Sequence, residues 1–400
     1  MNYVTQDFFN FKGYFVQKVE KDESSITVFL VSRRRTAFCP MCGKRSKALF
    51  SCGEQRIVKH SKYEGRLVSI SFTKRRFTCR HCGKPFSEKP EFVESKARTT
   101  HNFALEAVYA LSKASFSTVC EAYQTSHSFL SNSLKKLSFN KAWPEGKLRL
   151  GFDEHSYAKR KMMITVTELS TKTLLAILPS YSRQAVMDYL DSRTEEELSR
   201  VVELCFDMKF KQRKAVQEYF QGIPVVIDKF HVLFRLAYLI DLDRKFICPG
   251  LGRGKFENLK QAMRKPIFKL TQKEKGYLDK MFAQYPELKV RYDIYQKLAK
   301  FYGSQTKDEG RARLREVQEN IKNLDKMSYL RPFANTLKNL EEDILNYFDN
   351  RTTNAFTEGV HTKIKMLKRT SYGFKNPKIY IKKMMLAFLP FAIISLLLPH

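Results

Sequence analysis

The chain has 400 residues, of which 43% are hydrophobic, enough apolar material for more than one hydrophobic core. Its 72 Lys and Arg residues against 41 Asp and Glu residues leave a formal net charge of +31. Because the basic residues recur along the whole chain instead of gathering in one amphipathic helix or tail, this charge favours nucleic acid over a membrane surface as the partner. The start, MNYVTQDFFNFKGY, lacks a basic region followed by an apolar one, so we expect no secretory signal.

The first part of the chain is predicted to be rich in strands and basic on its surface. Residues 12–33 alternate apolar and polar side chains, as in a half-buried β-hairpin. Two basic runs, SRRR at 32–35 and KRR at 74–76, are expected to hold DNA phosphates, and a solvated basic face is the alternative. The residues assigned to this contact are Arg33, Arg34, Arg35, Arg75 and Arg76.

Two Cys-x-x-Cys pairs, Cys39 with Cys42 and Cys79 with Cys82, are each followed by a glycine. Four thiolates suit tetrahedral Zn²⁺, and the strand-like residues 66–78 between the pairs fit a zinc ribbon with a structural ion. A redox dithiol fits poorly, because two pairs occur and neither belongs to a recognisable thioredoxin-like unit. No ligand role is assigned to Cys52, His81, Cys120, Cys205 and Cys248.

Residues 96–145 have a helical pattern. Within them, residues 117–123 and 127–137 have the proportions of a helix-turn-helix, in which Ser128, Asn132 and Lys135 would face DNA. A plain pair of packed helices is the alternative, since any small helical bundle can show this pattern.

A succession of strands ending in acidic residues follows. LRLGF alternates apolar residues and predicts a strand with Asp153 at its C-terminal end. Two more strands follow, then a helix and a strand ending in Asp207, then another helix and a strand ending in Asp228, with His231 just beyond. This order predicts a ribonuclease-H-like fold, in which carboxylates converge on two Mg²⁺ ions about 3.5–4 Å apart. Glu154 is expected to point away from Asp153.

The third acid is expected to open a late helix. Residues 354–369, NAFTEGVHTKIKMLKR, place Glu358 on the same face as Lys365 and Arg369, opposite an apolar face. Charge pairing on a solvated helix is the alternative explanation of this pattern. The apolar tail, residues 384–398, spans about 15 residues and contains Pro390, so it predicts a core helix and leaves a membrane contact as the alternative.

Four features in order resemble one protein family: the paired Cys-x-x-Cys ribbon, GFDEHSYAK, VVIDKFHV and NAFTEGVHTKIKMLKRTSYGFKN. They resemble transposases of the bacterial insertion-sequence-L-three family, a branch of the Asp-Asp-Glu transposases. The resemblance implies a zinc-binding N-terminal region, a helix-turn-helix, and a ribonuclease-H-like catalytic domain interrupted by a long helical insertion. It also implies cleavage at terminal inverted repeats and strand transfer, dependent on Mg²⁺ or Mn²⁺.

Carried over to this sequence, Asp153 matches the first acid of the family and Glu358 the last. Asp207, in an Asp-Met pair, is preferred as the second acid, and Asp228 with His231 is the alternative or accessory element. Lys159, Lys365 and Arg369 are expected to contact the DNA backbone. The rival functions are a non-catalytic DNA-binding regulator and a nuclease on the same fold.

The sequence therefore predicts a multidomain α+β protein. Its expected parts are a β-rich zinc ribbon (1–95), a helix-turn-helix (96–145), the first part of the catalytic domain (146–235), a helical insertion (236–350) and the last part of the catalytic domain (351–400). The expected partners are double-stranded DNA and at least a second copy of the chain on DNA, with no membrane. The expected location is the bacterial cytoplasm, with the nucleoid.

Overall fold

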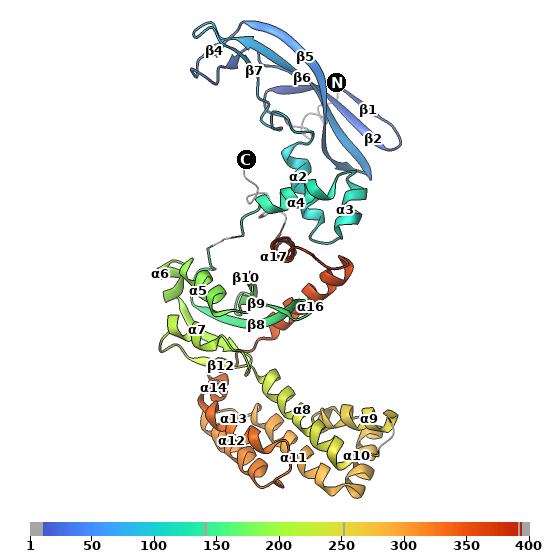
Figure 1. The fold of residues 1–400 in the computed structure, drawn as a ribbon, viewed down its shortest axis with the longest axis vertical. Helices are drawn as coiled ribbons and strands as arrows, with labels where there is room; N and C mark the ends of the chain where they lie inside the picture. The colour runs from blue at the N-terminus through green and yellow to red at the C-terminus, as the bar shows by residue number, and fades with distance from the viewer. Residues whose placement is uncertain (1–10, 140–141, 251–252, 391–392, 394–400) are drawn as a thin grey trace. The chain divides into compact units, whose positions relative to one another are not determined.

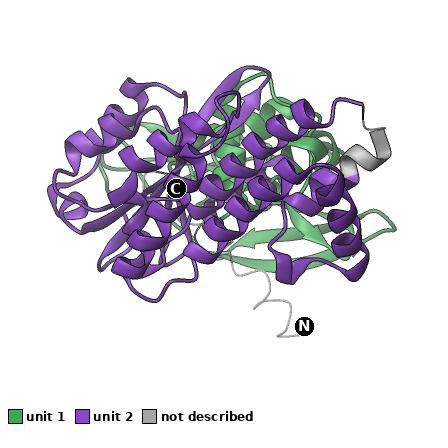
Figure 2. Ribbon diagram, turned by 90° about the horizontal axis from the view of Figure 1, so that it is seen from below, with its two compact units in different colours: residues 1–140, 366–400 green, residues 141–365 purple. Residues whose placement is uncertain are grey.

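The computed structural model describes residues 11–139, 142–250, 253–390 and 393 of an α+β protein (Figure 1). The chain forms two compact units, coloured separately in Figure 2: residues 1–140 with 366–400 form unit 1, and residues 141–365 form unit 2. The multidomain α+β class is as predicted. The segment 351–400, expected to complete one domain, is shared between the units, since residues 366–400 belong to unit 1.

A five-stranded sheet forms the β-rich part of unit 1, with the order β1-β2-β6-β5 and with β7 also paired to β6. Its strands are β1 (Tyr14–Lys21), β2 (Ser25–Ser32), β5 (Leu49–Tyr63), β6 (Arg66–Thr78) and β7 (Pro85–Ser87), and β3 (Ala37–Phe38) pairs with β4 (Arg45–Ser46) in a separate ribbon. The predicted hairpin of residues 12–33 is present as the antiparallel pair β1–β2. Val28, Val68 and Ile70 are fully buried in the core of this sheet.

Among the described residues, the helices of unit 1 are α2 (His101–Ala110), α3 (Phe116–Ala122), α4 (His127–Lys136) and α17 (Pro377–Leu386). The two short helices predicted at 117–123 and 127–137 are therefore present as α3 and α4. The side chain of Ser126 accepts a hydrogen bond from the backbone N–H of Phe129 and so caps α4. α17 packs on α4, where Lys382 Nζ donates to the carbonyl of Leu137 at 2.6 Å.

The predicted tail helix, residues 384–398, lies only partly within the residues that the structure describes. α17 ends at Leu386, and Met384 and Leu386 are fully buried. Residues 391–392 and 394–400 lie outside the described residues. No helix among the described residues is long and apolar enough to cross a membrane.

The sheet of unit 2 has the strand order β10-β9-β8-β11-β12. The strands are β8 (Leu148–Ala158), β9 (Lys161–Glu168), β10 (Thr173–Leu178), β11 (Val201–Phe206) and β12 (Val225–Ile227). The first three form an antiparallel meander, β11 runs parallel to β8, and β12 runs parallel to β11. Phe206 pairs with both Phe152 and Ile227, which sets one row across three parallel strands.

One predicted strand boundary is wrong. Asp153 was expected to end its strand, but β8 continues to Ala158. The parallel pairing with β11 stops at Phe152, whereas the antiparallel pairing with β9 goes on from Asp153 to Ala158. Pairing with β9 therefore keeps β8 extended beyond Asp153.

Helices complete unit 2. Three lie between the strands: α5 (Arg183–Asp191), α6 (Glu195–Ser199) and α7 (Arg213–Tyr219). The other described helices are α8 (Lys229–Ile247), α9 (Arg253–Met263), the 3-10 turn η1 (Ile267–Lys269), α10 (Gln272–Gln284), α11 (Pro286–Phe301), α12 (Lys307–Lys322), α13 (Arg331–Asn339), α14 (Glu341–Leu345), α15 (Tyr347–Asn350) and α16 (Ala355–Thr370), whose residues from Met366 onward belong to unit 1. α8 leads from the sheet into the helical part (Figure 1), where the buried Asp243 of α8 pairs with Arg291 of α11 at 2.6 Å.

Candidate active site and metal centres

Three aspartates lie together at one edge of the unit 2 sheet. Asp153, Asp207 and Asp228 each directly follow one residue of the row paired across β8, β11 and β12. Because parallel strands run in the same direction, the residues that follow such a row meet at the same edge, where sites of open α/β sheets collect. Strand register alone therefore gathers three carboxylates that are far apart in the sequence.

His231 lies between two of these aspartates. It stands in the first turn of α8, with Nε2 3.3 Å from Asp207 Oδ2 and Nδ1 3.0 Å from Asp228 Oδ2. Burial alone would lower the pKa of His231, but the hydrogen bond with Asp228 and the charge of Asp207 outweigh it and raise the pKa to about 9. The imidazolium therefore donates to Asp228, forms an ion pair with Asp207, and lies between the two carboxylates.

Asp153 is buried, with 6% of its surface exposed. Its Oδ1 accepts a hydrogen bond from the backbone N–H of Glu154 at 2.7 Å, and one carboxylate oxygen lies within 4.8 Å of ligand atoms of Asp207 and His231. Burial raises the pKa of Asp153 to about 7. The side chain of Glu154 is half-buried, and its hydrogen bond adds to burial in raising the pKa of Tyr181. The two adjacent acids therefore have separate surroundings.

Glu358 comes from α16, in its first turn. A carboxylate oxygen lies within 4.8 Å of ligand atoms of Asp228 and His231, and burial together with the charge of Asp228 raises the pKa of Glu358. The expected amphipathic pattern of this helix is present, since Glu358 and Lys365 are exposed while Val360 is buried.

The start of α16 is tied to the sheet by residues that the sequence analysis did not identify. The backbone N–H of Asn354 donates to Asp228 Oδ1 at 3.0 Å, and its side-chain amide donates to the carbonyl of Phe152 at 3.3 Å. Thr357 forms a 2.7 Å hydrogen bond with Thr167 of β9. One sequence pattern points to Asn354, because asparagine directly before a helix is a common capping residue. These bonds bring Glu358 to the aspartates.

A buried network of two histidines and a threonine, also not predicted, lies behind Asp153. Thr165 Oγ1 forms hydrogen bonds with His155 Nδ1 at 2.8 Å and with His361 Nε2 at 2.9 Å. His361 Nδ1 lies 3.5 Å from Asp153 Oδ2. Burial and the neighbouring His155 lower the pKa of His361 to about 3, so the ring is neutral at physiological pH.

The acidic cluster has the chemistry of a divalent-cation site. Mg²⁺ prefers hard oxygen ligands and keeps several waters, so a few carboxylates are sufficient. The ligand atoms fall into two overlapping groups that share His231: one adds Asp153 and Asp207, and the other adds Asp228 and Glu358. A cavity of about 680 Å³ adjoins them, and its lining includes Asp207, His231 and Glu358. The donor set therefore fits Mg²⁺ or Mn²⁺ beside a substrate.

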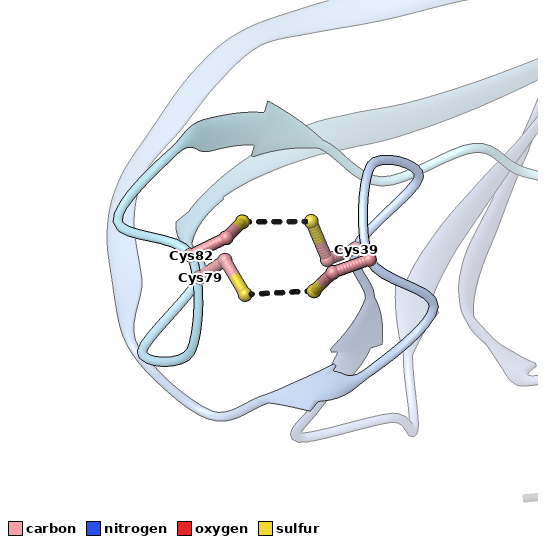
Figure 3. Close-up of side chains that lie close together, drawn as sticks. Cys39, Cys79 and Cys82 are labelled. Carbon is pink, nitrogen blue, oxygen red and sulfur yellow. Dashed lines mark hydrogen bonds between the residues drawn. The ribbon is translucent and has the colours of Figure 1, made fainter.

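The four predicted zinc ligands meet in unit 1 (Figure 3). Cys39 Sγ lies 3.7 Å from Cys82 Sγ, and Cys42 Sγ lies 3.5 Å from Cys79 Sγ. Tetrahedral Zn²⁺ with bonds of about 2.3 Å requires sulfurs roughly 3.8 Å apart, which these distances approach. The backbone N–H of Cys82 donates a hydrogen bond to Cys79 Sγ and lowers the pKa of that thiol to about 6, which favours the thiolate that binds metal.

The two cysteine turns are built alike. In each, the backbone N–H of the glycine donates to the carbonyl of the first cysteine at 2.9 Å, from Gly43 to Cys39 and from Gly83 to Cys79. Both glycines have a φ of 72°, a left-handed conformation that glycine adopts without strain. The glycine after each pair is therefore a geometric requirement of the cluster, and the four sulfurs fit Zn²⁺.

The predicted DNA contacts differ in their surroundings. The exposed ones are Arg33, Arg34, Arg35, Arg76, Ser128, Asn132, Lys135, Lys159, Lys365 and Arg369. Arg34 also pairs with Glu91 at 3.2 Å. Arg75 is different, because its side chain is only 17% exposed and pairs at 2.7 Å with Glu88. Arg75 also donates to Ser32 Oγ, so its guanidinium is occupied inside unit 1.

Comparison with known proteins identifies the family to which this chain belongs. A family model described as a transposase, of the Asp-Asp-Glu insertion-sequence-L-three type, matches residues 150–384, more than half of the chain. The chain belongs to the insertion-sequence-L-three family of transposases, as the sequence motifs predicted. It is similar to the transposase for insertion sequence element IS1001 of Bordetella parapertussis, with 20% identity over 390 residues that cover 94% of this chain and 96% of the relative. The protein is thus a transposase of an insertion sequence, and DNA is its substrate.

Proposed function

We propose that this transposase cleaves and joins DNA at a two-metal site held by Asp153, Asp207 and Glu358, in a catalytic domain of the ribonuclease-H-like type. The observation that carries the proposal is the convergence of Asp153 of β8, Asp207 directly after β11 and Glu358 of α16 around His231, beside a cavity that Asp207 and Glu358 line. The strand order β10-β9-β8-β11-β12, an antiparallel meander followed by two parallel strands, supports the fold type.

Asp207 is the better second ligand than Asp228. Both oxygens of Asp228 are already engaged, one by the backbone of Asn354 and the other by His231, and the residue is completely buried. Asp207 is only half-buried and lines the cavity. Asp228 therefore acts as an organiser that holds α8 and α16 at the site, and His231 positions Asp207.

When bound, two Mg²⁺ or Mn²⁺ ions stabilise the attacking and leaving oxygens of a phosphoryl transfer. Asp153, Asp207 and Glu358 supply the oxygen ligands for them. Neutral His361 and the backbone N–H of Glu154 orient the carboxylate of Asp153. Water is the first nucleophile, and the freed 3′-hydroxyl of the element is the second.

Unit 1 is proposed to bind the terminal inverted repeats. The Cys₄ cluster acts as a zinc ribbon, and α3 with α4 acts as a helix-turn-helix whose exposed Ser128, Asn132 and Lys135 face DNA. The exposed arginines beside the cluster hold phosphates. Bringing two element ends together requires at least two copies of the chain on DNA.

The test uses the full chain with duplexes that carry the inverted repeats flanking its gene. We expect Mg²⁺-dependent cleavage by the wild type, loss of cleavage in Asp153→Asn and Asp207→Asn, and full activity in Asp188→Asn, an exposed acid of α5. Pre-cleaved ends with a 3′-hydroxyl should join to a plasmid target. Unchanged cleavage by Asp153→Asn would refute the assignment, and cleavage without joining would indicate a nuclease.

A further inference from the structure

A row of exposed aromatic side chains lies on α8 beside the acidic site. Phe230, Phe234 and Tyr238 follow one another at intervals of four residues, so they share one face of the helix. Their exposed fractions are 44%, 63% and 41%. Large apolar side chains that are exposed together mark a binding surface more often than an idle one. These three residues, called the aromatic row below, line the same cavity as Asp207 and Glu358.

Cations are interleaved with the aromatic row. The guanidinium of Arg235 lies 5.4 Å from the ring centroid of Tyr238, and the ammonium of Lys229 lies 5.3 Å from that of Phe230. Lys209 and Arg235 also line the cavity. Aromatic faces with cations beside them are the composition of sites for unpaired nucleic acid, where bases stack on rings and phosphates meet the charges.

We propose that the aromatic row stacks unpaired bases of the DNA strand whose phosphate is held at the acidic site, so that the preferred substrate is an element end opened at the cleavage position. This inference rests on the proposed function, because the acidic site places the strand. In a continuous duplex each base face is covered by its neighbours, so an aromatic ring can stack on a base only after the base leaves the helix.

The spacing of the row suits such bases. Residues four apart on a helix are separated by ~6 Å along its axis. Stacked bases repeat at ~3.4 Å. The distance between successive side chains of the row is therefore close to two stacking distances, which leaves room for one base between neighbouring rings. The row begins at Phe230, next to His231 of the acidic site, and continues along α8, so the strand runs from the acidic site along the row.

The test combines a protein variant with a DNA variant. Phe234→Ala removes the most exposed ring of the row, and Phe234→Tyr keeps a ring there. Phe246→Ala is the matched control, because Phe246 lies on the same helix, is 62% exposed, and projects about 120° around the helix axis from Phe234. Each protein is assayed in Mg²⁺ on duplex ends in which single nucleotides around the cleavage position are replaced, one at a time, by abasic nucleotides.

We expect Phe234→Ala to lower cleavage of intact ends by roughly 10- to 100-fold, as loss of stacking on one base predicts. Phe234→Tyr and Phe246→Ala should cleave at rates close to the wild type. At one or two abasic positions the difference between Phe234→Ala and the wild type should disappear, because the base that stacks is absent from both reactions.

A Phe234→Ala defect that stays the same at every abasic position would overturn the proposal, as would a variant with no defect. A change in the oligomeric state of the DNA-free chain in Phe234→Ala would also overturn it, by showing that the row binds a second copy. In these cases loss of cleavage in Asp153→Asn would leave the proposed function standing. If Asp153→Asn cleaves normally, the proposed function itself fails and the stacking inference falls with it.

Discussion

Arg75 and Arg76 are neighbours in one basic run, but the structure predicts opposite consequences for their loss. The Arg75 side chain bonds both oxygens of Glu88, with contacts of 3.1 and 2.7 Å, and donates to the carbonyl of Arg34 at 2.6 Å. Removing one partner of a buried ion pair costs about 3–5 kcal/mol. The backbone N–H of Arg75 still donates to Glu88 at 3.0 Å in an alanine variant, so we expect Arg75→Ala to destabilise unit 1 by about 3 kcal/mol.

Hydrogen exchange of the full chain measures this effect, through peptides that cover β6 and β7. Arg76→Ala, at an exposed position, should change the same exchange free energies by less than about 0.5 kcal/mol while weakening DNA binding. The double variant Arg75→Ala/Glu88→Ala should be less destabilised than the sum of the single variants, since no unpaired buried charge remains. Equal exchange in Arg75→Ala and Arg76→Ala would refute the reasoning.

Three further predictions concern packing, pH and metal. Gly151→Ala would place a methyl group 2.4 Å from Asn354 Oδ1, so we expect the free energy of unfolding to fall by about 1–3 kcal/mol, and by less in an Asn354→Ala background. Urea unfolding followed by the fluorescence of Trp143, the single tryptophan, measures this change. An unchanged urea midpoint would contradict the prediction. Burial lowers the pKa of His60 to about 4 from an ordinary value of 6.5, so the unfolded chain takes up a proton that the folded chain does not, and stability falls as the pH drops from 6.5 to 4. Between pH 6.5 and 4 the melting temperature of His60→Gln should fall less than that of the wild type. Parallel plots of melting temperature against pH for the two proteins would contradict the role of His60. Freshly purified wild type should contain one zinc per chain and Cys79→Ser much less, and a zinc-free wild type would reject the Cys₄ proposal.

Local patterns in the sequence predicted much of unit 2. Short apolar runs identified its strands, and the acids Asp207 and Asp228 follow β11 and β12 as expected. The amphipathic pattern around Glu358 predicted α16. These features depend on neighbours in the chain, so periodicity reports them. The end of β8 depends instead on which of two partner strands continues, and the pattern around Asp153 does not contain that information.

The polar framework of the site escaped prediction for the same reason. The bonds from Asn354 to Phe152 and from His361 to Thr165 join residues 202 and 196 positions apart, and no spacing in one sequence identifies such pairs. Arg75 is a different case. It shares a face of β6 with the buried Phe77, because side chains alternate along a strand, whereas its neighbour lies on the other face. The face of Arg76, however, also carries the buried Val68 and Ile70, so strand periodicity alone does not tell which of the two arginines is buried.

The long-range bonds of Asn354 also set the order in which the site is assembled during synthesis. Asn354 donates to Asp228, 126 residues earlier, and to Phe152, 202 residues earlier. A ribosome delivers β8, β11 and β12 with their aspartates first, and the helices that follow must emerge before α16 can return to them. Glu358 is thus the last acid to arrive, and a nascent chain lacks the complete carboxylate set until its final segment pairs back onto the sheet.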